Sequence, residues 1–231
     1  MTLSKIFSNV IKLLVKYKSA FRSGVWMTIK LSVITVFFGL IFGSIIALRK
    51  LSDFHIGKIK PLNILATIYV EVIRGTPLLL QLYFFYFLIP QALPFLGLDK
   101  VKCVLIALIF NSAGYVAEII RAGILAVDPG QTEAARSLGL NARQTLFSIV
   151  LPQAVKNILP AMGNELVMMF KETALASTFF VGEITTQSNI VGGVTFLQIE
   201  AIIISGIFYL MLTLPLGRLI GIYEKRLKVS D

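Results

Sequence analysis

The sequence has few of the residues on which enzymes and metal proteins depend. Its 231 residues include one cysteine, Cys103, and one histidine, His55. One cysteine cannot form a disulfide within the chain, and neither residue has the partners of a redox motif or a metal site. No nucleophile motif is present, and no GxxxxGK[ST] phosphate-binding loop, so the chain cannot hydrolyse ATP by that route. We therefore expect no catalytic residue, no metal ligand and no cofactor bound by this chain.

Acidic residues are also scarce, with 12 against 22 basic residues and a net charge of +10. By contrast, 56% of the residues are hydrophobic and the mean hydropathy is +0.83. These values exclude an ordinary soluble domain. The run Leu31–Leu48 carries no charge and is long enough to span a bilayer. It is too long for a signal peptide, so we expect it to remain as a membrane anchor. In a membrane protein, excess basic residues reflect cytoplasmic loops and anionic lipid rather than nucleic-acid binding.

Five apolar segments predict an all-α membrane protein with five transmembrane helices, at about residues 24–49, 61–89, 101–125, 160–180 and 199–222. The fourth segment is the least apolar, because it contains Glu165, Lys171 and Glu172. Each ionised group costs about 2.5–3.5 kcal/mol at a helix centre. We therefore expect this helix to line the interior of the bundle. The tandem Gly192-Gly193 predicts a flexible loop between the last two spans.

Residues 1–22 predict an amphipathic helix that lies in the membrane interface and does not cross the membrane. Between Leu3 and Phe21 apolar residues recur at helical spacing, and lysine, serine and asparagine occupy the other face. A helix that binds a partner protein is the alternative. The remaining residues, 23–231, are expected to form one transmembrane domain.

Basic residues determine the expected orientation. They cluster between spans one and two, between spans three and four, and after span five: Arg49, Lys50, Lys58, Lys60, Arg136, Arg143, Lys156, Lys225, Arg226 and Lys228. The positive-inside rule places these segments in the cytoplasm. The lysine-rich N-terminal helix is then outside, against the rule, and anionic headgroups of the outer leaflet would hold it there.

A polar island between about residues 126 and 158 interrupts the apolar segments. An Asp-Pro pair at 128–129 predicts the start of a short helix, and Gly139 predicts its left-handed end. An Asn and a Gln, at 141 and 144, predict a capping box for a second helix, which Pro152 is expected to end. Two capped helices at a membrane surface make a rigid knob that can transmit force from a soluble partner.

The same island resembles a family signature. Glu133-Ala134-Ala135, Gly139, Ile149 and Leu151-Pro152 match the pattern EAA-x3-G-x9-I-x-L-P of ATP-binding-cassette importer permeases at every fixed position. Residues 74–81, 115–121, 130–131 and 171–175 are similar to the polar amino-acid branch of that family, except that Ala174 stands where the branch often has Ser. The resemblance covers nearly the whole chain.

The resemblance implies a multi-pass permease subunit in the inner membrane of a prokaryotic cell. It implies that the first island helix seats in a cleft of a separate ATPase, through the coupling residues Glu133, Ala134, Ala135 and Gly139. The other implied partners are an extracytoplasmic amino-acid-binding protein, a second permease subunit, identical or different, and membrane lipid. ATP and Mg would act on the ATPase and not on this chain.

Ionisable residues within the predicted spans are the candidates for the substrate path: Glu71, Arg74, Glu118, Glu165, Lys171 and Glu172. Glu71 and Arg74 are three residues apart on one helix face, as are Glu118 and Arg121, so each pair can neutralise itself. A structural ion pair is the alternative to a pathway role. It is favoured for the second pair, and for the first the two roles are balanced.

Lys171 and Glu172 are adjacent, so their side chains point about 100° apart and cannot simply pair with each other. They need partners on other helices or on a substrate, although the resemblance also suggests an architectural role. If the two i,i+3 pairs are neutral and Lys171 neutralises one further acid, one acid remains, either Glu165 or Glu172. This excess negative charge favours a cationic ligand. We therefore expect polar or basic amino acids as substrates.

As a whole, the sequence predicts the transmembrane permease subunit of an ATP-dependent amino-acid importer. A secondary amino-acid transporter would instead use the intramembrane acids as proton or sodium sites and would need no ATPase. A membrane signalling protein would use the island for docking without moving a substrate. Neither alternative accounts for the spacing of the island motif.

Overall fold

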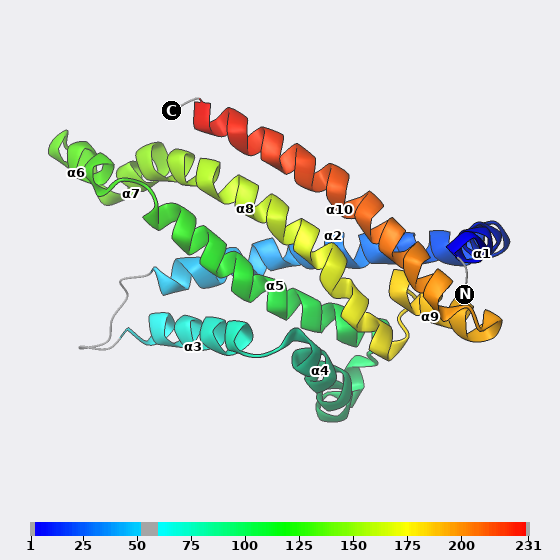
Figure 1. The fold of residues 1–231 in the computed structure, drawn as a ribbon. Helices are drawn as coiled ribbons and strands as arrows, with labels where there is room; N and C mark the ends of the chain where they lie inside the picture. The colour runs from blue at the N-terminus through cyan, green and yellow to red at the C-terminus, as the bar shows by residue number, and fades with distance from the viewer. Residues whose placement is uncertain (1–2, 52–59, 230–231) are drawn as a thin grey trace. The chain divides into compact units, whose positions relative to one another are not determined.

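The computed structural model describes residues 3–51 and 60–229, and of residues 228 and 229 the backbone alone. His55 and Lys58, discussed above, lie outside the described residues. Every regular element that is described is helical (Figure 1). In chain order these are α1 (Leu3–Lys16), α2 (Lys18–Lys50), α3 (Pro61–Gly75), α4 (Leu78–Ala92), η1 (Pro94–Leu96), α5 (Lys100–Leu125), α6 (Pro129–Ser137), α7 (Ala142–Thr145), η2 (Leu146–Val150), α8 (Leu151–Glu172), η3 (Thr173–Phe179), α9 (Ile184–Thr195) and α10 (Gln198–Val229).

Within the described residues, four helical stretches are long and apolar enough to cross a membrane. They are α2, α5, the continuous stretch Ala142–Phe179, and Gln198–Leu227 of α10. The broken pair α3 and α4 makes a fifth crossing if it counts as one span. The predicted all-α membrane fold, with an N-terminal helix and short island helices, is therefore confirmed.

The second span was predicted as one continuous helix at about residues 61–89, and this prediction is wrong. α3 ends at Gly75 and α4 begins at Leu78. Pro77 disfavours helical backbone at the residue before it, and Thr76 is extended, with φ −117° and ψ 144°. The hydroxyl of Thr76 donates to the carbonyl of Val72 at 2.8 Å, which satisfies one of the carbonyls left open at the end of α3.

The chain divides into two compact units, which are described separately. Unit 1 comprises Met1–Thr35, Leu78–Ile109 and Leu166–Gly217. One apolar core in this unit contains Leu31, Leu82, Val104, Leu108, Ala176 and Phe179. A second core joins α1 to α9 and α10 and contains Val10, Leu13, Phe21, Val191 and Ile204.

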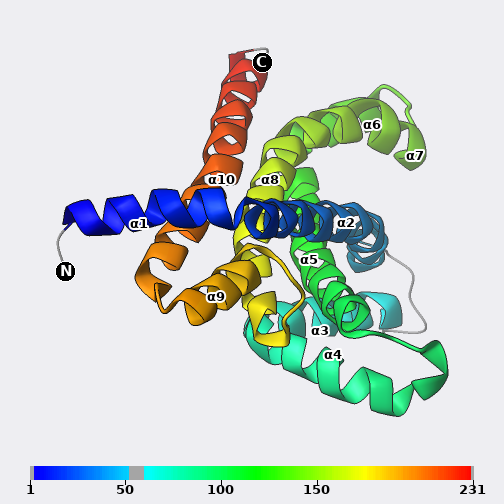
Figure 2. The same ribbon diagram turned by 90° about the vertical axis from the view of Figure 1, so that its right-hand side faces the viewer.

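Within unit 1, α1 leads into α2 with a sharp change of direction, since α1 is seen end-on in Figure 1 and lengthwise in Figure 2. Its inner face belongs to the second core, and Asn9 Nδ2 donates to Glu200 Oε1 at 3.0 Å. On its outer face Leu3, Phe7 and Val15 are 84%, 69% and 69% exposed. The apolar residues of α1 are thus divided between a buried face, which packs in the second core, and an exposed face.

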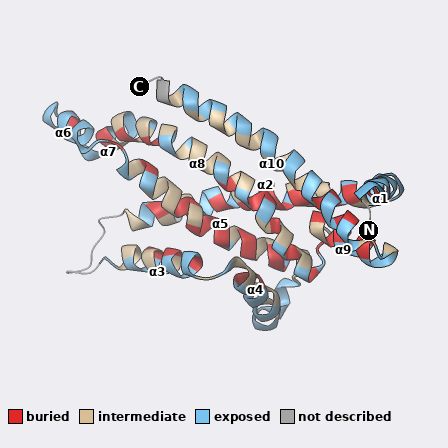
Figure 3. Ribbon diagram, viewed as in Figure 1, coloured by how far each residue is buried: buried red, intermediate tan, exposed pale blue. Residues whose placement is uncertain are grey.

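Unit 2 comprises Val36–Pro77, Phe110–Glu165 and Arg218–Asp231. Its helices α2, α3 and α5 meet in a small core of Ala47, Val70 and Ala117. A Cβ on Gly43 would lie 2.7 Å from Val116 Cγ1, so this approach of α2 to α5 accepts only glycine. A second core, of Val127, Val150 and Ala154, joins the island to the start of α8. Buried residues are most continuous along α5 (Figure 3).

The predicted flexible loop at Gly192-Gly193 is wrong. Both glycines lie inside α9, and Gly192 is buried. The side chain of Gln198 occupies the space where a Cβ of Gly192 would stand. Glycine is needed here for close packing, which the sequence pattern alone does not distinguish from chain flexibility.

Candidate functional site: membrane-embedded charges and the capped island

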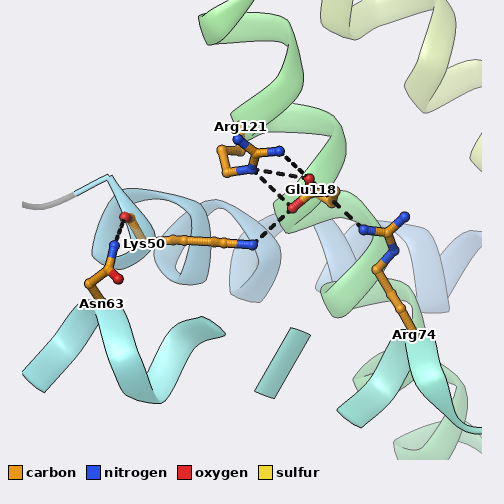
Figure 4. Close-up of polar contacts among 5 residues, drawn as sticks. All are labelled: Lys50, Asn63, Arg74, Glu118 and Arg121. Carbon is orange, nitrogen blue, oxygen red and sulfur yellow. Dashed lines mark hydrogen bonds and ion pairs between the residues drawn. The ribbon is translucent and has the colours of Figure 1, made fainter. Parts of the chain in front are cut away.

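Glu118 of α5 lies among three basic side chains of unit 2 (Figure 4). Its Oε2 is 3.1 Å from Lys50 Nζ, at the end of α2. Arg121 donates from Nε to both carboxylate oxygens, at 3.0 and 3.1 Å, and from Nη2 to Oε1. Arg74 Nη1, from α3, is 3.9 Å from Oε1. We call these four residues the Glu118 cluster; in it one carboxylate joins basic groups from α2, α3 and α5.

The predicted pairing of Glu118 with Arg121 is confirmed, but that of Glu71 with Arg74 is wrong. Arg74 is directed to Glu118, and its guanidinium carbon lies 5.8 Å from the centre of the Tyr115 ring. Glu71 is exposed and forms no ion pair among the described residues. The i,i+3 spacing could not reveal this, because the competing carboxylate comes from another helix.

The sequence did not predict that Lys50 belongs to the Glu118 cluster, or that Asn63 contacts Lys50. The side chain of Lys50 is only 14% exposed, because it extends to Glu118. Asn63 Nδ2 donates to the backbone carbonyl of Lys50, which links the end of α2 to the start of α3. From its position in the sequence, Lys50 was expected only as one of the basic residues between spans one and two. The available signal was its position at a helix end, from which a long lysine stem can reach along the apolar surface.

Glu165 of α8 is the most buried of the predicted path residues, with 3% exposure. The hydroxyl of Ser112, on α5, donates to its Oε1 at 2.8 Å. Both residues belong to unit 2, and Ser112 is fully buried. A carboxylate in such surroundings is costly unless it is hydrogen-bonded or meets a ligand. The pair therefore places a buried hydrogen bond between α5 and α8.

Lys171 and Glu172 lie at the end of α8, in unit 1. Lys171 is exposed and Glu172 is partly buried. Glu172 Oε2 is buried and has no hydrogen-bond partner in the part of the chain that the structure describes. Leaving a buried acceptor unsatisfied costs about 1–3 kcal/mol, and more for a charged group. This oxygen is therefore a position at which a donor from a ligand or a partner subunit would be stabilising.

Two buried acids of unit 1 were missed by the sequence analysis. Glu183, with 0% exposure, caps α9 and accepts from the backbone N–H of Thr185 at 2.7 Å and of Thr186 at 2.5 Å. The Tyr209 hydroxyl also donates to it, at 2.8 Å. Glu200 is 1% exposed in the first turn of α10. Acids at helix starts are stabilised by the free N–H groups there, and this local signal could have identified both.

The island has the predicted capped geometry. Asp128 Oδ1 accepts from a backbone N–H two residues on at 2.8 Å, and α6 begins at Pro129. Asn141 and Gln144 form the reciprocal capping box, with both hydrogen bonds at 2.9 Å. Gly139 has φ +85°, in the left-handed region that favours glycine. These predictions are confirmed.

The predicted coupling residues do not all face outward. Glu133, Ala134 and Gly139 are exposed, whereas Ala135 is 4% exposed and lies on the inner side of α6. α6 packs on η2. Leu138, which the sequence analysis did not single out, is 85% exposed. The outer surface of the island therefore combines an acid, a small residue and an exposed leucine.

The prediction that Pro152 ends the second island helix is wrong. α7 continues through the π-turn η2 into α8, and the chain is helical from Ala142 to Phe179. At the end of η2 the N–H of Leu151 donates to the carbonyl of Leu146, five residues back. The wider turn accommodates the proline ring that follows it, without the clash that breaks a regular helix.

No metal site emerges from the residues that the structure describes. They contain no group of three or more His, Cys, Asp or Glu side chains able to hold a metal ion.

Known proteins are similar to this chain in sequence and in fold. Residues 39–229 match the family described as binding-protein-dependent transport system inner membrane component. The arginine transport system permease protein ArtQ of Bacillus subtilis (strain 168) is 40% identical over 208 residues, which cover 90% of this chain and 92% of ArtQ. The glutamine transport system permease protein GlnP of Escherichia coli (strain K12) is 32% identical over 206 residues, which cover 89% and 92%. The crystal structure of an amino acid ABC transporter with histidines has a TM-score of 0.84 and 44% identity, and covers 92% of this chain and 96% of that one.

Proposed function

The chain belongs to the family of binding-protein-dependent transport system inner membrane components, and on this premise we propose that it is the permease subunit of an ATP-dependent amino-acid importer. It is a multi-pass membrane protein. The relatives named for arginine and glutamine transport support amino acids as its substrate class. A transporter driven by an ion gradient is the alternative, and it gives no reason for the island.

The single observation that carries the proposal is the capped island. Its first helix is fixed at one end by the Asp128 cap and at the other by the left-handed Gly139. Glu133, Ala134 and Leu138 stand on its outer surface. A short helix that exposes an apolar side chain suits docking into a hydrophobic groove of another protein. We assign this surface to the ATPase, with Ala135 holding the helix to the rest of the island.

The partner ATPase would bind ATP and Mg and perform the hydrolysis, because this chain has no phosphate-binding loop. A second permease subunit would complete the path, and an extracytoplasmic binding protein would deliver the amino acid. ATP can drive the change between inward and outward access only if it binds the two states with different affinities.

We further propose that Glu165 and Glu172 belong to the substrate path, each in its own unit. Glu165 is buried beside the hydroxyl of Ser112, and Glu172 has a buried oxygen without a hydrogen-bond partner among the described residues. Both acids suit contact with the amino group of a polar or basic amino acid. Lys171, exposed beside Glu172, would meet the carboxylate of the same class of ligand.

Glu71 and Arg74 are proposed for the path in unit 2, where α3 ends at Gly75. Interrupted membrane helices are tolerated where their open backbone groups line a cavity or are buried in protein. The side chain of Arg74 is 45% exposed, and its 3.9 Å distance from Glu118 is too long for a hydrogen bond. Its guanidinium can therefore still donate to a ligand carboxylate. Glu118 is held by short bonds on several sides, and these contacts favour a bracing role for it over direct substrate contact.

Reconstitution into liposomes tests the proposed function. The chain is combined with a candidate ATPase and binding protein from the same organism, and uptake of labelled arginine, glutamine and a neutral control solute is measured. Uptake should require internal ATP and external binding protein. Uptake that follows an imposed proton or sodium gradient without ATP would establish the alternative.

A charged residue on the island provides a sharper test of the docking surface. Leu138→Asp places a carboxylate at an 85% exposed position, where it should not disturb folding. It should weaken pull-down of the ATPase and uncouple ATP hydrolysis from uptake. Ser137→Asp, also at an exposed position beside the end of α6, is the matched control for added charge. Equal retention of the ATPase by wild type and Leu138→Asp would refute this placement.

A further inference from the structure

An apolar groove lies in unit 1 where α1 meets α2. It has a volume of about 370 Å³ and is lined by Leu14, Lys18, Phe21, Arg22, Val25, Phe208, Met211 and Leu212. Phe21 is 1% exposed, and its ring centre is 5.8 Å from that of Phe208. The groove therefore has an aromatic floor and aliphatic sides contributed by α1, α2 and α10.

Two cations stand among these apolar residues. Lys18 and Arg22 are four residues apart in the first turns of α2, so they share one helix face. Both are exposed, and neither forms an ion pair within the residues that the structure describes. The sequence offers no acid nearby in the chain, because the first acidic residue is Asp53. An apolar groove with unpaired cations is complementary to an amphiphile with an anionic head.

We propose that this groove binds an acidic phospholipid. One acyl chain lies along Phe21, Phe208 and the aliphatic sides, and the phosphate meets Lys18 and Arg22. A guanidinium binds phosphate oxygens with two parallel hydrogen bonds, and a lysine adds a flexible point charge. This inference concerns a different surface from the substrate path and does not depend on the transport role.

The position of the groove favours lipid over other anionic ligands. α2 is long and apolar enough to cross a membrane, and α1 leads into it with a sharp change of direction (Figure 2), with Leu3, Phe7 and Val15 exposed on the outer face of α1. A helix with this arrangement lies in the interface, where lipid headgroups meet acyl chains. A small soluble anion would use the two cations but not the apolar floor.

The chain contains a fluorescent residue one helical turn from the groove residue Arg22. Trp26 is its single tryptophan, is 68% exposed, and follows Arg22 by one turn of α2. Brominated acyl chains quench a tryptophan that they touch. The full chain is incorporated into bilayer nanodiscs that contain brominated phosphatidylglycerol or brominated phosphatidylcholine at the same mole fraction, and quenching of Trp26 is compared. Preference for the acidic lipid should be roughly fivefold for each basic residue involved, and so up to about thirtyfold for both.

Two double variants locate the preference. Lys18→Gln with Arg22→Gln should abolish it, whereas Lys5→Gln with Lys12→Gln removes the same charge from α1 outside the groove and should leave it largely intact. Circular dichroism and size exclusion should show both variants folded, because all four side chains are exposed.

Four results would each overturn the proposal. Equal quenching of the wild type by the two lipids would show no preference. Equal loss in both double variants would mean a diffuse effect of charge. Competition by glycerol phosphate as effective as that by the lipid would mean a site for a free anion. Absence of quenching by either lipid would mean that protein covers the groove.

Discussion

Replacing Glu118 by glutamine should destabilise the protein more than any other single change in its cluster. The amide keeps the shape of the side chain but removes its charge, and Lys50, Arg74 and Arg121 then share no carboxylate. Removing one partner of a buried pair costs about 3–5 kcal/mol. Because Glu118 is 19% exposed, water screens part of this, and the low end, about 3 kcal/mol, is expected.

The geometry also ranks the other members of the cluster. Arg121→Gln removes the shortest hydrogen bonds but leaves Glu118 paired with Lys50, so a loss of about 1–2 kcal/mol is expected. Arg74→Gln removes a 3.9 Å contact of a 45% exposed side chain, and the loss should stay below about 1 kcal/mol. Glu71→Gln, at an exposed acid with no ion pair among the described residues, is the matched control and should change stability by less than about 0.5 kcal/mol.

Thermal unfolding in detergent, followed by the loss of the monodisperse peak in size exclusion, measures these differences. For a chain of this length, 1 kcal/mol corresponds to roughly 2–4 °C, so Glu118→Gln should unfold roughly 6–12 °C below the wild type. A drop no greater than that of Glu71→Gln would refute the view that the cluster holds α2, α3 and α5 together.

Three further changes test the island, the path and the orientation. Gly139→Val puts a β-branched side chain at φ +85°, at a cost of about 1–3 kcal/mol, and should reduce ATPase association in pull-down; unchanged association at equal expression would contradict this. Glu172→Gln should raise the amino-acid concentration for half-maximal uptake, and more for a cationic than for a neutral substrate; an equal rise for both would argue against direct contact. A cysteine at the exposed Ser8, with the buried Cys103 replaced by serine, should react with an impermeant thiol reagent in intact cells; labelling only after the membrane is opened would reverse the proposed topology.

Features determined by neighbouring residues could be predicted from the sequence. The caps at Asp128 and Asn141, the left-handed Gly139 and the Glu118–Arg121 pair all depend on residues within one helical turn. Their energetics are local, so spacing and residue type are sufficient. The break after Gly75 also has a local signal, the proline at 77, which the prediction of one continuous span did not use.

Features that depend on distant segments could not be predicted. Arg74 meets Glu118 and not Glu71, and Lys50 turns back to the same carboxylate, because α2, α3 and α5 converge there. Ala135 is buried by packing of α6 on η2, and Gly192 is required by Gln198. Each of these contacts follows from how helices pack, and the local pattern of a single sequence does not reveal which distant segments meet.

The π-turn at Leu146–Val150 has a mechanical consequence. Within unit 2, the helix that begins at the Asn141 cap continues without a loop to Glu165. If the island docks on the ATPase as proposed, a displacement of the island would be transmitted along this helix toward the buried carboxylate of Glu165. The η2 segment is a point of altered hydrogen-bond register within this helix, since its bonds differ from those of the regular helix on either side. The stiffness of this short segment would determine how much of a displacement at the island reaches Glu165 and how much is lost as bending.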